Sequence, residues 1–209
     1  MPDTDAPANP LLVSTRNAHK VGEIRAILGP DFLVSDLSAV PGLPEVEETG
    51  DSFEENATLK AVAASLHFDG WVIADDSGLE VDALGGGPGV RSARYAGENS
   101  GDAANNVLLL QNLLPFRGKE RSARFRCVIV LARNGRKLAA FAGSVEGTVI
   151  NTPRGAGGFG YDPLFVPEGF CETFAQLGNA VKNGLSHRAR ALQGLAAWKG
   201  WDEKSSLTH

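Results

Sequence analysis

Two adjacent carboxylates, Asp75 and Asp76, follow a short apolar run in the stretch "WVIADDSGLEV". Like charges beside a buried strand destabilise a fold unless a positive group neutralises them. We expect "WVIA" to form a strand that ends at these aspartates, with a turn at Ser77-Gly78. Without such a turn, neighbouring side chains of an extended strand face opposite sides of the sheet and cannot bind the same ion.

A divalent cation is the positive partner that these carboxylates indicate. Glu47 and Glu48 stand upstream, just before a predicted helix. One or two carboxylates, together with phosphate oxygens and waters, are the usual ligands of Mg²⁺. Open α/β sheets also bind their ligands at strand ends. A loop-capping aspartate in a structural salt bridge is the alternative that the spacing leaves open.

Two predicted helices begin with cations, although the dipole of a helix favours acidic residues there. The first starts at Asn17 and carries Lys20 in its first turn, and the last starts with "SHR" at 186–188. Free backbone N–H groups, the dipole and a cation together form an anion site. Solvated surface charges would explain either helix alone, whereas an anion site explains both.

Lys60 supplies a third cation, on the apolar face of a helix predicted over 52–67. Helical periodicity places it on one stripe with Phe53, Ala57, Ala61, Ala64 and Phe68. An unpaired ammonium is costly on such a face, so we expect a carboxylate or a ligand anion beside it. A lysine that extends along the surface to water is the alternative.

The sequence lacks the motifs that mark several other kinds of enzyme. Neither glycine-rich stretch, "GGGPGVRS" or "GAGGFGYD", carries the GK[ST] of a P-loop NTPase. "DDSG" lacks the DxD of an aspartyl-phosphate phosphatase, and there is no zinc-ligand spacing or nucleophile elbow.

The elements that must position these residues alternate between helix and strand. We expect strands at 11–15, 32–35 and 71–74, helices at 17–28, 52–67, 101–114 and 186–198, and two long strands over 123–150 joined at Asn134-Gly135. This pattern predicts an α/β fold with a mixed central sheet and flanking helices. We expect an arm over 1–10, one domain over 11–200 and a tail over 201–209.

Composition narrows the functional class. The chain has 209 residues and a net charge of -5, which argues against a broad nucleic-acid-binding surface. Its longest apolar run, "CVIVLA", is far too short to cross a membrane. The first ten residues lack the features of a signal peptide. Cys127 and Cys171 form no CxxC pair, which is typical of reduced thiols in a cytoplasmic protein.

Five segments resemble, in order, those of the Ham1/RdgB-type inosine triphosphate pyrophosphatases. They are "STRNAHKVGEI", "EETGDSFEENATLKA", "ADDSGLEVDALGGGPGVRSARYAG", "GGFGYDPLF" and "SHRARAL". The resemblance runs from about residue 11 to 195. It implies two lobes enclosing a nucleotide cleft, a homodimer, and Mg²⁺-dependent hydrolysis of ITP, dITP and XTP to the monophosphate and pyrophosphate.

Carried over by position, the resemblance gives individual residues their roles. Glu48 and Asp76 would hold the metal, Asp76 would accept the proton of the attacking water, and Asp75 and Lys60 would support the metal cluster. The nucleotide would contact Thr15, Arg16, Asn17, Ala18, His19, Lys20 and Ser77, and its base and sugar Phe159, Gly160, Tyr161, Asp162, Lys182, His187 and Arg188. Two departures stand out: Arg16 replaces a glycine of many relatives, and no acidic residue precedes Lys182 in "GNAVKNGLSHR".

The implied mechanism is attack by water at the α–β linkage, with Lys20 and Lys60 neutralising the charge that spreads over the phosphate oxygens. Phe159 would stack on the purine, and His187 or Arg188 would donate to O6. Phe159 as an ordinary core residue is the alternative reading of that position. Two other functions fit the scaffold: a Maf-like pyrophosphatase that prefers modified or pyrimidine bases, and a catalytically silent nucleotide sensor.

Overall fold

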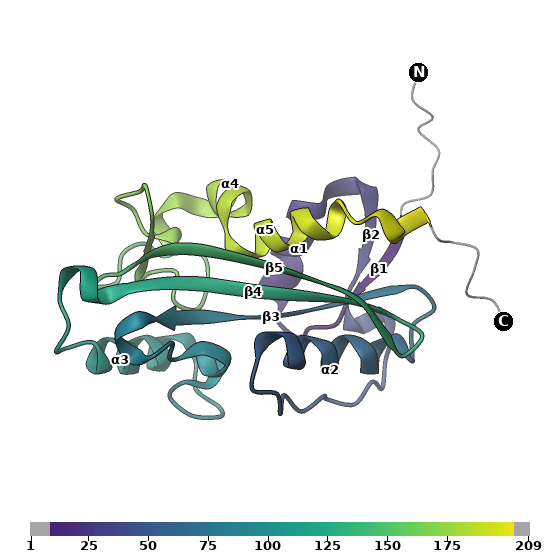
Figure 1. The fold of residues 1–209 in the computed structure, drawn as a ribbon, viewed down its shortest axis with the longest axis horizontal. Coiled ribbons are helices and arrows are strands. Elements are labelled where there is room, and N and C mark those ends of the chain that lie inside the picture. The colour runs from purple at the N-terminus through teal and green to yellow at the C-terminus, as the bar shows by residue number, and fades with distance from the viewer. Residues whose placement is uncertain (1–8, 203–209) are drawn as a thin grey trace, which may run out of the picture.

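Short parallel strands and long antiparallel strands share one sheet. The computed structural model describes residues 9–202. The six strands lie in the order β2-β1-β3-β4-β5-β6 (Figure 1). β2 (Phe32–Ser35) and β1 (Asn9–Val13) run parallel to the start of β3 (Trp71–Val81), whereas β4 (Ser122–Arg133), β5 (Arg136–Val149) and β6 (Phe165–Pro167) continue the sheet in antiparallel pairs. The predicted mixed α/β fold is confirmed.

The predicted turn at Ser77-Gly78 is wrong, because β3 continues through both aspartates. Residues 72–81 pair in unbroken register with β4. Gly78 serves close packing instead: a Cβ there would lie 2.3 Å from the carbonyl oxygen of Gly89 and 2.4 Å from Ser92 Oγ. β1 pairs with β3 only as far as Ile73. The aspartates therefore lie just beyond the carboxyl end of the parallel strands, where α/β sheets place their ligands.

The predicted hairpin is confirmed. β4 and β5 are joined at Asn134 and Gly135, whose φ angles of 51° and 73° are both positive. Two positive φ angles define the type I′ turn that Asn-Gly favours, and its twist matches that of the flanking strands. The two long strands carry the sheet across the whole length of the molecule (Figure 1).

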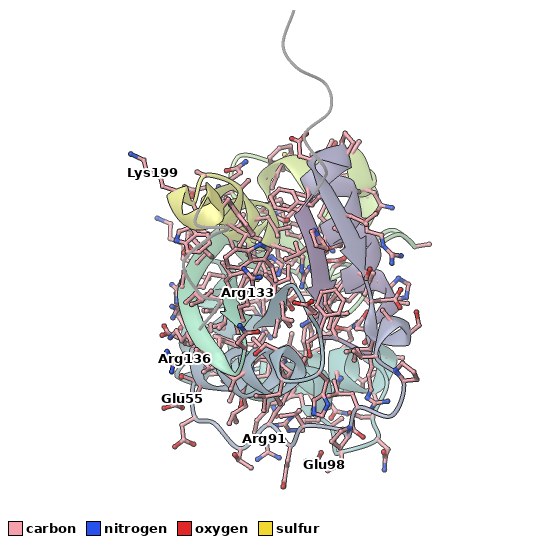
Figure 2. All side chains as sticks on the ribbon, turned by 90° about the vertical axis from the view of Figure 1, so that its right-hand side faces the viewer. Glu55, Arg91, Glu98, Arg133, Arg136 and Lys199 are labelled. Atoms are coloured by element: carbon pink, nitrogen blue, oxygen red, sulfur yellow. The ribbon has the colours of Figure 1, made fainter. Side chains whose placement is uncertain are left out.

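Helices cover both faces of the sheet. α2 (Phe53–Ser65) and α3 (Asp102–Asn112) lie below the long strands in Figure 1, and α4 (Phe174–Leu185) and α5 (His187–Ala196) lie above them. α1 (Ala18–Leu28) packs against α4 and α5. A capping box formed by Ser52 and Glu55 starts α2. Charged side chains such as Glu55, Glu98 and Lys199 lie at the outline of the molecule (Figure 2).

Two larger apolar cores occupy different halves of the long strands, and two smaller ones pack against α2. One of the larger cores joins α1 and α5 to β1 and the start of β3, around residues such as Leu11, Ile24 and Leu192. The other joins α3, α4 and β6 to the far halves of the long strands, around Leu109 and Phe165. These cores form the two lobes that the resemblance implies.

The predicted limits of the domain were too narrow. β1 begins at Asn9, inside the predicted arm. Trp201, assigned to the tail, packs edge-on against Trp71 at 5.3 Å between ring centroids. The rest of the predicted arm and tail, 1–8 and 203–209, lies outside the described residues. Helix α4 was not predicted.

Candidate active site

A cavity of about 310 Å³ opens beside β3, between the upper and the lower helices. Because β1 ends at Val13, the edge of β3 beyond Ile73 is left free on that side. Most residues proposed from the sequence line this cavity: Thr15, Arg16, Asn17, Lys20, Glu48, Lys60, Asp76, Ser77, Phe159, Gly160, Tyr161, Asp162, Lys182, His187 and Arg188. Ala18, His19 and Asp75 are not part of the described lining. The functional roles of these residues stay predictions.

Lys60 lies between two carboxylates, as its place on an apolar helix face predicted. Its Nζ is 2.7 Å from Glu48 Oε1 and 3.5 Å from Asp76 Oδ1. It also donates to the backbone oxygen of Asp75 at 3.0 Å, on the free edge of β3. Arg94, which sequence analysis did not select, approaches the second oxygen of Glu48 at 3.5 Å. The carboxylate pair is thus neutralised from two sides.

The two carboxylates of this pair differ in their electrostatic surroundings. Burial raises the pKa of Asp76 above its usual value, although Lys60 and Lys20 act against this shift. Burial also acts to raise the pKa of Glu48, but Lys60, Lys20 and Arg94 outweigh it and hold that pKa below its usual value. Burial thus has the larger effect on the pKa of Asp76, whereas the neighbouring cations have the larger combined effect on the pKa of Glu48.

Asp75 faces the opposite side of β3 from Asp76, as strand alternation requires. Its carboxylate forms an ion pair with Lys20 and accepts from Arg188 Nε at 2.9 Å. The Cys127 thiol approaches it at 2.9 Å. Burial opposes ionisation, but Arg188 and Lys20 hold the pKa of Asp75 well below its usual value. Asp75 thus pairs with Lys20 and Arg188, whereas Asp76 lies near Lys60.

The start of α1 brings a cation, Lys20, and a side-chain-capped helix terminus to the cavity wall. Asn17 is the N-cap, and its side-chain oxygen accepts from the backbone N–H groups of His19 and Lys20. Thr15 Oγ1 accepts from the N–H of Asn17 at 3.2 Å. His19 is not part of the described lining but stacks on Phe159, which is, with 5.4 Å between ring centroids. The helix start where the sequence predicts an anion site therefore lies next to Phe159.

The loop at 155–162 is held by one of its own carboxylates, Asp162, and by Asp102 of α3. Asp162 accepts from the N–H of Phe159 at 2.9 Å and from Lys182 Nζ at 2.5 Å. Asp102, at the start of α3, accepts from the N–H of Gly160 at 2.6 Å. A Cβ at Gly158 would lie 2.0 Å from the Asp162 carboxylate, and the φ of Gly158 is 72°. Only glycine fits this position without strain.

Lys182 and Arg188 share a carboxylate that sequence analysis missed. Glu23, on α1, lies 2.8 Å from Lys182 Nζ and forms an ion pair with Arg188. Lys182 also lies over the Phe159 ring, 4.5 Å from its centroid. Glu23 and Asp162 therefore supply the acidic partners of Lys182 that its own segment lacks. A single glutamate in mid-helix gives no spacing signal, so the sequence could not reveal this role.

His187 is buried and uncharged at neutral pH. Burial, with Arg188 and Lys182 adding repulsion, holds its pKa well below the usual value. Its ring stacks on Phe125 at 4.9 Å between centroids. Its Nδ1 has no hydrogen-bond partner among the described residues. A neutral imidazole in the cavity wall can present one donor and one acceptor to a ligand.

Sequence comparisons agree with the resemblance. The sequence model of the Ham1 family matches residues 11–198. A dITP/XTP pyrophosphatase of Geobacter sulfurreducens is 50% identical over 192 residues, covering 91% of this chain and 96% of the relative. A dITP/XTP pyrophosphatase of Bacillus licheniformis is 47% identical over 188 residues, covering 90% and 96%.

Solved structures agree with the fold. The Ham1 protein of Staphylococcus aureus superimposes with a TM-score of 0.79 at 42% identity, over 90% of this chain and 96% of that one. A nucleoside-triphosphatase / dITP/XTP pyrophosphatase of Mycobacterium abscessus gives a TM-score of 0.72 at 41% identity, over 90% and 100%. This chain belongs to the Ham1 family.

Proposed function

We propose that this protein is a nucleoside-triphosphate pyrophosphatase that hydrolyses the deaminated purine nucleotides ITP, dITP and XTP. The products are the nucleoside monophosphate and pyrophosphate. The observation that carries the proposal is one cavity into which distant segments bring a carboxylate pair, Glu48 and Asp76, and cations from several helices, such as Lys20, Lys60 and Arg188. The relatives that carry the name dITP/XTP pyrophosphatase support the choice of substrate.

Glu48 and Asp76 are the residues that would hold Mg²⁺. Both carboxylates form ion pairs with the same ammonium group, that of Lys60. Two carboxylates together with phosphate oxygens are a usual set of ligands for Mg²⁺. Bound there, Mg²⁺ supplies charge neutralisation to the phosphate oxygens. The carboxylate of Asp75 lies on the other side of β3 and keeps Lys20 and Arg188 in place.

The triphosphate would lie between the start of α1 and Lys60. Asn17 at the start of α1 and the side chains of Lys20 and Lys60 line the same cavity. Negative charge spreads over the phosphate oxygens as the bond between the α and β phosphates breaks. Fixed positive groups then stabilise the transition state without reorganising.

Asp76 is the proton acceptor in this scheme. Water attacks phosphorus at the α–β linkage, its proton passes to Asp76, and pyrophosphate leaves. Asp76 lines the cavity, where its carboxylate can accept a proton from a water beside the phosphate. Lys60 and the amide of Asn56 contact its two oxygens, at 3.5 and 3.3 Å respectively.

Base selection would take place at the Lys182 and Arg188 end of the cavity. Phe159 offers a ring face for the purine, and Arg188 and His187 offer donors to O6. Adenine carries an amino group at this position. This amino group would face the donors of Arg188 and His187 without an acceptor, so the site would reject ATP. Guanine also carries O6, so selection against GTP must act at the 2-position of the ring.

Product identification tests the proposal. The protein is incubated with ITP, dITP, XTP, GTP, ATP and dTTP in the presence of Mg²⁺, and the phosphate product is identified. Pyrophosphate from the deaminated purines is the expected result. Orthophosphate, or no product, contradicts the proposed reaction, and a preference for dTTP favours the Maf-like alternative.

The cellular setting completes the proposal. The proposed homodimer rests on the family resemblance, and the proposed cytoplasmic location is supported by the two free thiols, Cys127 and Cys171. In residues 9–202 none of the helices has both the length and the apolar character needed to cross a membrane. Light scattering would give twice the 22.0 kDa chain mass for a dimer.

A further inference from the structure

Asn56 uses both ends of its amide to join two parts of the candidate active site. It is completely buried in α2, one helical turn before Lys60. Its Nδ2 donates to Asp76 Oδ2 at 3.3 Å, and its Oδ1 accepts from the backbone N–H of Gly50 at 2.8 Å. A buried amide with partners at both ends holds its neighbours in a fixed relation.

The two oxygens of Asp76 are held separately by one helix face. Lys60 Nζ lies 3.5 Å from Oδ1, and Asn56 Nδ2 lies 3.3 Å from Oδ2. Residues four apart lie above one another on a helix, so the two groups approach the carboxylate from adjacent turns. This arrangement fixes the plane of the carboxylate as well as its position.

The other end of the Asn56 amide fixes the loop that carries Glu48. Gly50, two residues after Glu48, packs directly on the helix: a Cβ at Gly50 would lie 2.6 Å from Glu55 Cβ and 2.8 Å from Asn56 Oδ1. Contacts this short leave no room for a side chain. The absence of a Cβ therefore permits the hydrogen bond from Gly50 to Asn56.

We propose that Asn56 is a positioning residue that sets the distance between Glu48 and Asp76 and the orientation of Asp76. It acts on both carboxylates through one rigid amide, so that a divalent cation and the attacking water meet a preformed pair. The inference rests on the proposed function, since it assigns Asn56 to the same site. Lys60 alone cannot do this, because an ammonium on a flexible chain does not fix the plane of a carboxylate.

Ser65 provides a matched control for a purely structural role. It is also a buried polar residue of α2, and its Oγ accepts from the backbone N–H of Gly135 at 2.9 Å, far along the helix from the cavity. Ser65→Ala thus removes a helix-to-loop hydrogen bond of the same kind. Asn56→Ala and Ser65→Ala are compared with wild type, together with Gly50→Ala, which disturbs the same contact from the loop side.

Three measurements are made on each folded protein. They are kcat and KM for ITP, the melting temperature, and binding of Mn²⁺ to the nucleotide-free protein by electron paramagnetic resonance. For Asn56→Ala we expect kcat to fall about 100-fold, the cost of a misplaced reacting group, with weaker Mn²⁺ binding. KM for ITP should stay within about threefold, since contacts to the nucleotide are retained. Gly50→Ala should change the same quantities in the same direction, and Ser65→Ala should lower only the melting temperature.

The inference is overturned if both Asn56→Ala and Gly50→Ala keep wild-type kcat and Mn²⁺ binding. It is also overturned if Ser65→Ala loses as much turnover as they do, because the effect would then be one of stability. Gly50→Ala decides the question if Asn56→Ala does not fold. Wild-type turnover of ITP is measured first: its absence contradicts the proposed function, whereas normal wild-type turnover with unaffected variants contradicts only the role of Asn56.

Discussion

The residues of the candidate site form buried charge pairs that neutralise one another before any ligand arrives. Asp75 holds Lys20 and Arg188, Lys60 holds Glu48 and Asp76, and Lys182 lies between Glu23 and Asp162. Buried ion pairs add little net stability, because the cost of desolvation offsets their attraction. Their number around one cavity is therefore better explained by a charged substrate than by a need for stability.

The buried His187 gives the protein a pH-dependent stability that can be measured. Because burial and the adjacent cations depress its pKa, below about pH 6.5 the unfolded chain binds a proton that the folded chain does not. Folding stability should fall from pH 7 to pH 5.5, with a contribution approaching about 1.4 kcal/mol per pH unit. Denaturant unfolding of wild type and His187→Gln at both pH values measures this contribution.

Comparing wild type with His187→Gln separates the effect of His187 from that of groups whose titration has the opposite effect on stability. Asp76 and Asp162 have raised pKa values, so they bind extra protons in the folded state and stabilise it as the pH falls, in both proteins alike. His67→Gln, at an exposed position, is the matched control. An unchanged pH slope in His187→Gln would show that His187 is not the group that titrates.

At the scale of elements, α5 depends on its close approach to β5. A Cβ at Gly143 would lie 2.2 Å from the carbonyl oxygen of His187 and 2.7 Å from the N of Ala191. The backbone of α5 must therefore move if any side chain is added, and His187 and Arg188 move with it. Only glycine permits this packing.

Gly143→Ala should lower the free energy of unfolding by about 1–3 kcal/mol, the usual cost of overpacking, and raise KM for ITP. Chemical denaturation and steady-state kinetics check the two effects. Gly184→Ala, on the exposed face of α4 with nothing within 4 Å of its Cβ, should keep KM and gain stability from helix propensity. A Gly143→Ala protein with wild-type stability and KM would show that α5 is not held this tightly.

Elements with a regular pattern could be predicted from the sequence. The apolar stripe of α2 placed Lys60 correctly beside carboxylates, and Asn134-Gly135 fixed the hairpin. The predicted third strand ended before Asp75, because two adjacent charges suggested the end of a strand. In the structure, Lys60, Lys20 and Arg188 neutralise these charges in the middle of β3. The partners of these cations come from distant segments, and no local pattern contains that information.

α4 was missed for a local reason. Gly178, inside it, has a φ of 78° and interrupts the helical conformation, and Gly184 weakens the helical pattern near its end. Asn56 and Glu23 were missed because single polar residues in mid-helix give no periodic signal. Their contacts, to Asp76 and to Lys182 and Arg188, depend on the tertiary structure alone.

At the scale of the whole molecule, apolar cores on both faces of the sheet support the walls of one cavity, and the carboxylates in those walls have cationic side chains as partners. Lys60 and Arg94 neutralise Glu48, and Lys60 also neutralises Asp76. Treatment with EDTA should therefore abolish ITP hydrolysis while changing the melting temperature by less than about 2 °C, since no charge pair is left uncompensated. Activity should return with added Mg²⁺. A large fall in melting temperature would show that the metal is structural.

The most direct test of the account is Asp76→Asn, measured with ITP at saturating Mg²⁺. We predict that the variant binds ITP with near wild-type affinity, because Lys20, Lys60, Lys182 and Arg188 remain, while kcat falls by about 10²–10⁴-fold through loss of the proton acceptor. Calorimetry and pyrophosphate release measure the two quantities. An Asp76→Asn protein that turns over ITP at the wild-type rate would contradict the account.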